Sequence, residues 1–100
     1  MNTTKVLPVI FRAEKHGPFK GDVTAVFPTL DEGGYMVRVY AHIGQHSKGS
    51  REWYNTTRAA KPDEYADLLT ELRGIYETGP DAVRLVARQR WTQAMDRHRA

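Results

Sequence analysis

The stretch DEGGYMVRVYAHI, residues 31–43, decides the fold that the sequence predicts. Its first four residues are a hairpin signal of the Asp/Gly kind. From residue 35 onward, apolar and aromatic side chains at odd positions alternate with Met36, Arg38, Tyr40 and His42 at even positions. Alternation with a period of two is typical of a half-buried strand. We therefore expect a strand with one apolar face and one polar, aromatic face.

Further strands are predicted on both sides of this stretch. Residues 5–13 and 22–30 are rich in β-branched and aromatic residues, and Pro28 is expected to end the second of these strands. Downstream, Gly44 and Gly49 frame an expected loop, and residues 51–57 are expected to form a short fourth strand. Strands in this order, joined by short turns, predict an antiparallel β-meander.

A helix is predicted to follow the strands. Pro62 fits a first helical position, the acidic residues after it favour the positive end of the helix dipole, and Gly79-Pro80 supplies the stop. The apolar residues fall on one stripe, which consists of Tyr65, Leu68, Leu69, Leu72, Ile75 and Tyr76. We expect this stripe to pack on the apolar face of the meander and the opposite, acidic residues to lie in solvent: Asp63, Asp67 and Glu71.

The last twenty residues fit two patterns. Residues 83–91 alternate as a strand, and they also place apolar residues at helical spacing. A strand that rejoins the sheet is the preferred interpretation, followed by a short, basic helical tail from about residue 92. The predicted fold is one α+β domain over residues 1–100, an antiparallel β-meander of four to five strands with one amphipathic helix packed on one face.

Composition narrows the class of protein. Apolar residues make up 40% of the chain and charged residues 27%, as in ordinary globular domains. The sequence has no cysteine, no run approaching the roughly 18 apolar residues of a membrane span, and no signal-peptide pattern at its start. We expect a cytoplasmic protein with no membrane association. The net charge of +3 is unevenly spread, because residues 84–100 hold five arginines and one aspartate.

The run YAHIGQHS, residues 40–47, followed by WYNTTRAAKPDEYADLLTELRGIY, residues 53–76, resembles small uncharacterised proteins of bacterial phages and mobile elements. The resemblance covers roughly residues 10–77. It implies an accessory role, including one aimed at host defence in the manner of anti-CRISPR proteins. It assigns no catalytic residues.

Residues 40–54 are the densest group of functional side chains, and a metal site is the first interpretation to weigh. His42 and His46 have the spacing of a zinc pair on a helix. On an extended strand they would stand about 13 Å apart, at about 3.3 Å per residue, whereas zinc–imidazole bonds are about 2 Å long. A turn at Gly44 could bring them together, with His16 or Glu52 as a third ligand. Nothing in the sequence requires that turn, so we predict no metal and no cofactor.

Phosphodiester cleavage is the second interpretation. A metal-independent ribonuclease needs a base, an acid and a cation that stabilises the charge of the phosphate transition state. His42 or His46, together with Glu52, Lys48 and Arg51, contains these parts. Such residues are also common on solvated loops. The sequence therefore assigns no catalytic residue, and an enzyme is not the preferred interpretation.

Binding is the preferred function. An open sheet face with Arg38, Tyr40 and His42 could stack bases and neutralise phosphates, as RNA or single-stranded DNA binding requires. The same residue types anchor protein interfaces, and a non-catalytic module that engages a protein partner is the leading hypothesis. We expect Trp53 to pack inward and Tyr54 to stay partly open. The predicted binding residues are Arg38, Tyr40, His42, His46, Lys48, Arg51 and Tyr54.

Overall fold

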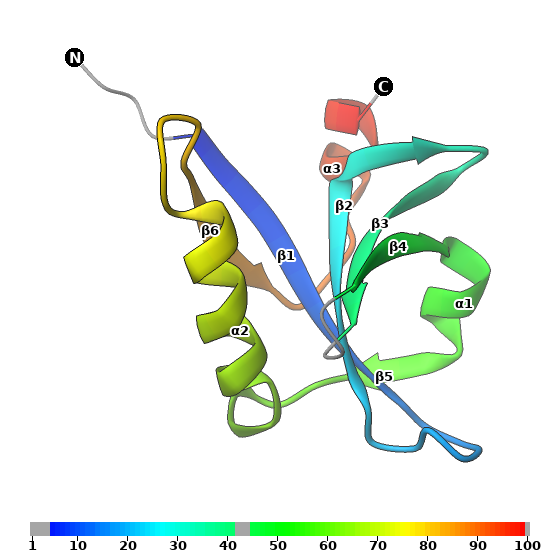
Figure 1. The fold of residues 1–100 in the computed structure, drawn as a ribbon. Coiled ribbons are helices and arrows are strands. Elements are labelled where there is room, and N and C mark those ends of the chain that lie inside the picture. Colours follow the sequence, from blue (N-terminus) through cyan, green and yellow to red (C-terminus); the bar gives the residue numbers. More distant parts are fainter. Residues whose placement is uncertain (1–4, 42–44, 100) are drawn as a thin grey trace.

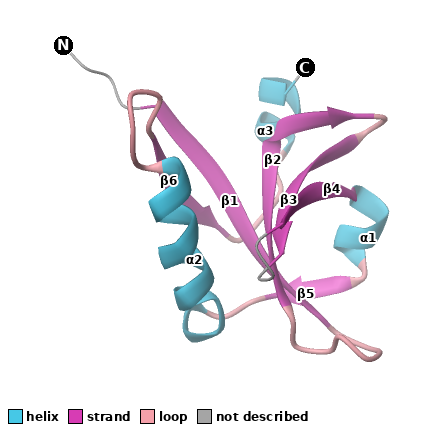
Figure 2. Cartoon of the chain, viewed as in Figure 1, coloured by secondary structure: helices cyan, strands magenta, loops and turns pink. Residues whose placement is uncertain are grey.

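The computed structural model describes residues 5–41 and 45–99 of the chain, excluding the side chains of residues 45, 98 and 99. Within them, six strands form one curled sheet in the order β4-β3-β2-β1-β5, with β6 also paired to β1 (Figure 1). Helices and loops connect the strands as Figure 2 shows. The elements are β1 (Lys5–Glu14), β2 (Val23–Gly33), β3 (Met36–Ala41), β4 (Gln45–Ser50), α1 (Arg51–Asn55), β5 (Thr57–Ala59), α2 (Pro62–Tyr76), β6 (Val83–Arg88) and α3 (Gln93–Arg99).

The antiparallel meander of an α+β fold is confirmed for β1 to β4, and the two later strands, β5 and β6, depart from it. β1 pairs antiparallel with β2 on one side. On its other side it pairs antiparallel with β5 near its end and parallel with β6 along residues 5–10. A parallel pair needs a long crossover connection. Here α2 lies between β5 and β6 along the chain, so it forms part of that connection.

One sequence prediction about a strand end was wrong. Pro28 does not end the second strand, because β2 continues to Gly33 with a shift of register between Phe27 and Asp31. A bulge tolerates a proline because the residue there needs no ladder hydrogen bond. The hairpin turn that follows places Gly34 and Tyr35 at positive φ, 60° and 63°. Positive φ at both central residues is the geometry of a type I′ turn, which suits the twist of paired strands.

The segment after β3 also differs from the prediction. Residues 45–50, expected to be a loop, form β4 and pair with all six residues of β3. Residues 51–55, expected to begin a strand, form the short helix α1. The hydroxyl of Ser50 accepts a hydrogen bond from the backbone N–H of Trp53 at 3.0 Å, which makes Ser50 the N-cap. This local hydrogen bond favours a helical turn over an extended strand.

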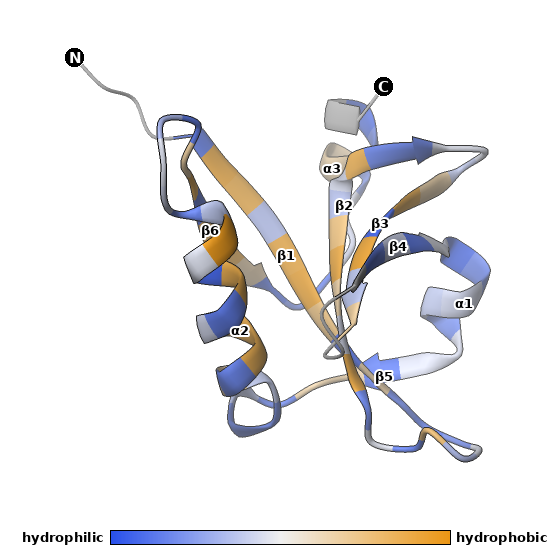
Figure 3. Ribbon diagram, viewed as in Figure 1, coloured by the Kyte–Doolittle hydropathy of each residue, from blue (hydrophilic) through white to orange (hydrophobic). Residues whose placement is uncertain are grey.

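Both faces of the sheet are covered, not one. α2 packs on the face of β1 and β2 that carries Phe11 and Phe27, and its Leu68 and Leu72 are buried there. α1 and α3 cover the other face, where Val37 and Val39 pack in one buried cluster with Tyr54 and Trp91. The prediction that α2 covers the Val37–Val39 face was therefore wrong. Figure 3 shows the apolar side of α2 turned toward the sheet.

The C-terminal region follows the preferred interpretation. Residues 83–88 form a strand, β6, and a short helix, α3, follows at residues 93–99. Leu85 of β6 is buried under α2, and its backbone N–H donates to a carboxylate oxygen of Glu77 at 2.8 Å. No helix of the described residues is long and apolar enough to cross a membrane.

Candidate functional site

Four of the predicted binding residues converge on the α2 face of the sheet. In the register of β3 and β4, Arg38 lies opposite Lys48 and Tyr40 lies opposite His46. Residues directly opposite each other in an antiparallel pair project from the same face, and their Cβ atoms lie about 5 Å apart. Arg38 and Tyr40 also share that face because they are two residues apart on one strand. The pairing of β3 with β4 therefore builds one polar cluster from two separate stretches of sequence.

Tyr40 is the buried member of this cluster. Its ring is buried, with 4% exposed, beneath α2. Its hydroxyl donates a hydrogen bond to the Glu71 carboxylate of α2. That hydrogen bond, and then burial, raise the pKa of Tyr40 above its ordinary value. The prediction of an open aromatic face was wrong here, and so was the expectation that Glu71 lies free in solvent.

His46 is the central group of the cluster. Its Nε2 lies 2.9 Å from the Tyr76 hydroxyl of α2, and its ring packs edge-on against Tyr40 at 4.7 Å between centroids. Partial burial, and then the positive charge of Arg38, lower the pKa of His46 below 6.5. His46 is therefore a neutral imidazole at neutral pH, with one nitrogen that donates and one that accepts.

Arg38 is a partly exposed cation of this cluster. Its Nε donates to a Glu32 carboxylate oxygen at 2.8 Å. Hydrogen bonds with Glu32, and then with Tyr76, raise the pKa of Arg38. The Tyr76 hydroxyl thus serves both Arg38 and His46. A guanidinium has five N–H donors, so these contacts leave donors for a ligand.

A cavity of about 480 Å³ opens above this cluster, and we call it the β3–β4 groove. It is lined by Glu32, Arg38, His46, Ser47 and Lys48. Lys48 is exposed, and it makes no ion pair within the described residues. The groove therefore offers two cations and a neutral imidazole to a ligand, against one carboxylate that Arg38 already neutralises.

The other predicted residues lie elsewhere. Arg51 projects on the opposite face, where its guanidinium lies 4.4 Å over the Trp91 ring and 3.7 Å from an Asp96 carboxylate oxygen. Tyr54 packs edge-on against Trp91 and is only 7% exposed, whereas Trp53 is partly buried. Trp53 packs against the same cluster as Tyr54, so only the expectation that Tyr54 stays partly open was wrong. The two rings lie on one side because α1 is a helix and does not alternate. His42, and whether it meets His46, lie outside the described residues.

Sequence reasoning missed three members of the cluster: Glu32, Glu71 and Tyr76. Tyr76 was placed only in the apolar stripe of the helix. The available signal was its hydroxyl, since a tyrosine at the end of a buried stripe usually needs a polar partner. Glu71 and Glu32 carried no local signal, because their partners lie on other elements.

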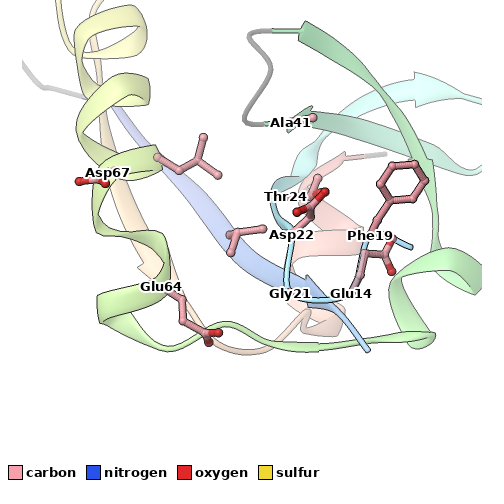
Figure 4. Close-up of a pocket in the computed structure, with 10 residues that line it drawn as sticks. Glu14, Phe19, Gly21, Asp22, Thr24, Ala41, Glu64 and Asp67 are labelled. Carbon is pink, nitrogen blue, oxygen red and sulfur yellow. The ribbon is translucent and has the colours of Figure 1, made fainter. Parts of the chain in front are cut away.

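A second cavity, of about 570 Å³, lies between the β1–β2 loop and α2 (Figure 4). Two of the four carboxylates that line it accept hydrogen bonds from other side chains. Glu14 accepts a hydrogen bond from the Trp53 indole, and Glu64 accepts two from Arg58. Asp67 points away from the cavity in Figure 4. The exposed apolar ring of Phe19, 66% accessible, stands at this cavity.

No three His, Asp or Glu side chains gather as metal ligands within residues 5–41 and 45–99. No protein-family profile matches the chain, and no curated protein or solved structure is significantly similar to it. The resemblance to phage and mobile-element proteins stays a prediction.

Proposed function

We propose that the chain binds single-stranded nucleic acid in the β3–β4 groove. The main support for this proposal is that Arg38 and Lys48 are cross-strand neighbours beside the His46 ring, in an accessible cavity. Cations neutralise phosphates and release counterions, which supplies most of the affinity for nucleic acids. A ring next to them can stack a base.

An unpaired strand suits this groove better than a duplex. Stacking on a side chain requires a base that is not already stacked inside a helix. His46 and Lys48 are two residues apart on β4, about 6.6 Å at 3.3 Å per residue. A ring and a cation at this separation can contact a base and a phosphate of one extended chain.

The burial of Tyr40 and Tyr54 argues against the alternative that these predicted binding residues form a protein interface. Interfaces are anchored by exposed aromatic side chains that become buried in the complex. Tyr40 and Tyr54 were two of the proposed anchors, and both are already buried in the isolated chain. The groove retains charged and polar groups, which favour a polyanion.

Fluorescence anisotropy with labelled single-stranded DNA and RNA 12-mers tests this proposal. We expect binding that weakens steeply between 50 and 200 mM salt, as phosphate contacts require. Lys48→Gln should weaken binding to every sequence and lower the salt slope by about 1.

The matched control is Lys15→Gln, which removes the same charge from an exposed lysine in the β1–β2 loop. Its binding should equal that of the wild type. Absence of binding at 50 mM salt, or equal losses in both variants, would contradict the proposal. Equal losses would mean that only net charge matters.

A protein partner is the second candidate function, at a different surface. The exposed Phe19 ring beside the second cavity favours it, because an aromatic side chain next to a hollow is a common anchor. A pull-down from a host lysate tests it, with nuclease treatment and a Phe19→Ala variant. Capture that survives nuclease but is lost in the variant supports this candidate. An anti-defence role would require that the captured protein belong to a host defence system.

A further inference from the structure

We infer that the β3–β4 groove cleaves RNA without a metal ion, with His46 as the general base. This inference rests on the proposed function, since the phosphate must first bind at Arg38 and Lys48. It adds a substrate class, RNA, and a reaction. The reaction requires a base in its active form, cations at the phosphate, and a hydrogen bond that orients the base.

The base is ready at neutral pH. A general base must be unprotonated and within reach of the proton that it removes. The lowered pKa of His46 keeps its imidazole neutral, and its side chain lies at the surface of the groove. The imidazole engages Tyr76 through Nε2, so Nδ1 is the nitrogen that the proposal assigns to the substrate.

Tyr76 orients the imidazole. When Nε2–H donates to the Tyr76 oxygen, Nδ1 becomes the acceptor of the neutral ring. The Tyr40 ring packs against the imidazole, and the hydrogen bond from Tyr40 to Glu71 anchors that ring to α2. Tyr76 is thus a positioning residue, comparable in role to the third member of a triad.

The cations stabilise the transition state. Attack on a phosphodiester adds negative charge to the phosphoryl oxygens, and preorganised donors at that point lower the barrier. Arg38 is already held by Glu32, so its remaining N–H groups do not need to be ordered during the reaction. Lys48 lies directly opposite Arg38 on β4 and lines the same groove, so one phosphate in the groove is within reach of both charges.

The proposed cleavage transfers protons only between the RNA, His46 and Lys48. His46 takes the proton of the ribose 2′-hydroxyl, and the 2′ oxygen forms a bond to phosphorus. The bond from phosphorus to the 5′ oxygen breaks, and that oxygen takes a proton from the Lys48 ammonium. The products are a 2′,3′-cyclic phosphate and a 5′-hydroxyl, and water restores both side chains. DNA lacks the 2′-hydroxyl, so it binds and stays intact.

The test incubates the full-length protein with a labelled RNA 12-mer and with DNA of the same sequence, both in excess EDTA. We expect RNA cleavage with a cyclic-phosphate end and no cleavage of DNA. His46→Gln should lower the cleavage rate about 100-fold or more, the usual share of a general base. Its affinity for the DNA 12-mer should fall by a much smaller factor than the cleavage rate, because Arg38 and Lys48 still bind the phosphates when the stacking ring is lost.

The control is His16→Gln, an exposed histidine of the β1–β2 loop, which should cleave like the wild type. Thermal melting of both variants verifies that they fold. DNA binding without RNA cleavage overturns this inference and leaves the proposed function intact. Loss of both binding and cleavage overturns both, and cleavage that persists in His46→Gln removes His46 as the base.

The pH dependence of kcat/KM distinguishes a positioning role of Tyr76 from a purely structural role. kcat/KM should rise with pH through the His46 pKa, and its half-point should lie below 6.5 because that pKa is lowered. Tyr76→Phe should reduce kcat/KM and move this half-point while DNA affinity is retained. A half-point at or above 6.5 in the wild type contradicts the assignment. Within residues 5–41 and 45–99, the charged and titratable groups around His46 are Glu32, Arg38, Tyr40, Lys48, Glu71 and Tyr76.

Discussion

The two faces of the sheet use aromatic and cationic side chains in opposite ways. On the α2 face, the polar ends of His46 and Tyr76 hydrogen-bond beside an accessible groove. On the α1 and α3 face, Tyr54 and Trp91 bury their rings and Arg51 lies flat over Trp91. The same residue types therefore serve a site on one face and stability on the other. Substitutions should separate the two faces by their cost in folding free energy.

The largest effect is expected for Trp91→Ala. The ring is buried, packs on Tyr54 and donates through its indole nitrogen to Asp96 at 2.7 Å. Removing a buried tryptophan creates a cavity and typically costs about 3–5 kcal/mol. Urea denaturation followed by circular dichroism should show that loss in the free energy of unfolding. Phe19→Ala, at an exposed ring, should stay within about 0.5 kcal/mol of the wild type.

Gly49→Ala should have the next largest effect. A Cβ at this position would lie 2.9 Å from Val39 Cγ1 and 3.1 Å from the Trp53 ring. Overpacking of this kind typically costs about 1–3 kcal/mol in the free energy of unfolding. Gly74→Ala in α2 is the matched control, because a Cβ there meets no atom within 4 Å. Alanine in a helix interior should add about 0.5–1 kcal/mol. The same sign for both variants in urea denaturation would contradict this packing argument.

Tyr40→Phe should give a smaller fall in the urea midpoint. It leaves the Glu71 carboxylate without its hydroxyl donor and keeps the buried ring. Because the folded pKa of Tyr40 is raised, its contribution is present below pH 10 and is lost as pH rises through the folded pKa. The midpoints of wild type and variant should therefore converge in that range. Tyr35→Phe, at a fully solvated turn, should change neither midpoint nor pH dependence.

The smallest effect concerns Glu64 on the rim of the second cavity. The Arg58 guanidinium, and then the backbone N–H of Lys61, lower the pKa of Glu64 from 4.5 to about 2. A depressed carboxyl pKa contributes stability above pH 4.5 that is lost as pH falls toward 2. The urea midpoint of Arg58→Gln should therefore fall less over this interval than that of the wild type. Arg97→Gln, at an exposed position of α3, should keep the wild-type pH dependence.

Local patterns predicted the elements whose signals lie within a few residues. The proline and acidic residues at the start of α2, and the Gly79-Pro80 stop, marked this helix closely. The alternation in residues 35–43 marked β3, which spans residues 36–41, whereas Tyr35 lies in the turn and residues 42 and 43 lie outside the described residues. The same alternation could not tell which face α2 would cover, because β1, β2 and β3 carry apolar residues on both faces.

Part of the candidate site was predicted from the sequence, and the register between β3 and β4 explains which part. Arg38, His46 and Lys48 were singled out from the sequence, and pairing of β3 with β4 brings them together. Arg51 and Tyr54 were included only because they are near in sequence. The N-cap of α1 turns the chain just before them, and they project on the other face.

The sequence by itself determined an α+β chain, the position of its main helix and the first three strands of its meander, because these depend on spacing within one segment. Only the tertiary structure decided that Tyr76 and Glu71 of α2 meet His46 and Tyr40 across 30 and 31 residues. It also decided that β6 returns parallel to β1. The physical reason is that contacts between elements depend on which apolar faces pack together. That packing minimises the exposed apolar surface of the whole chain and not of any one segment.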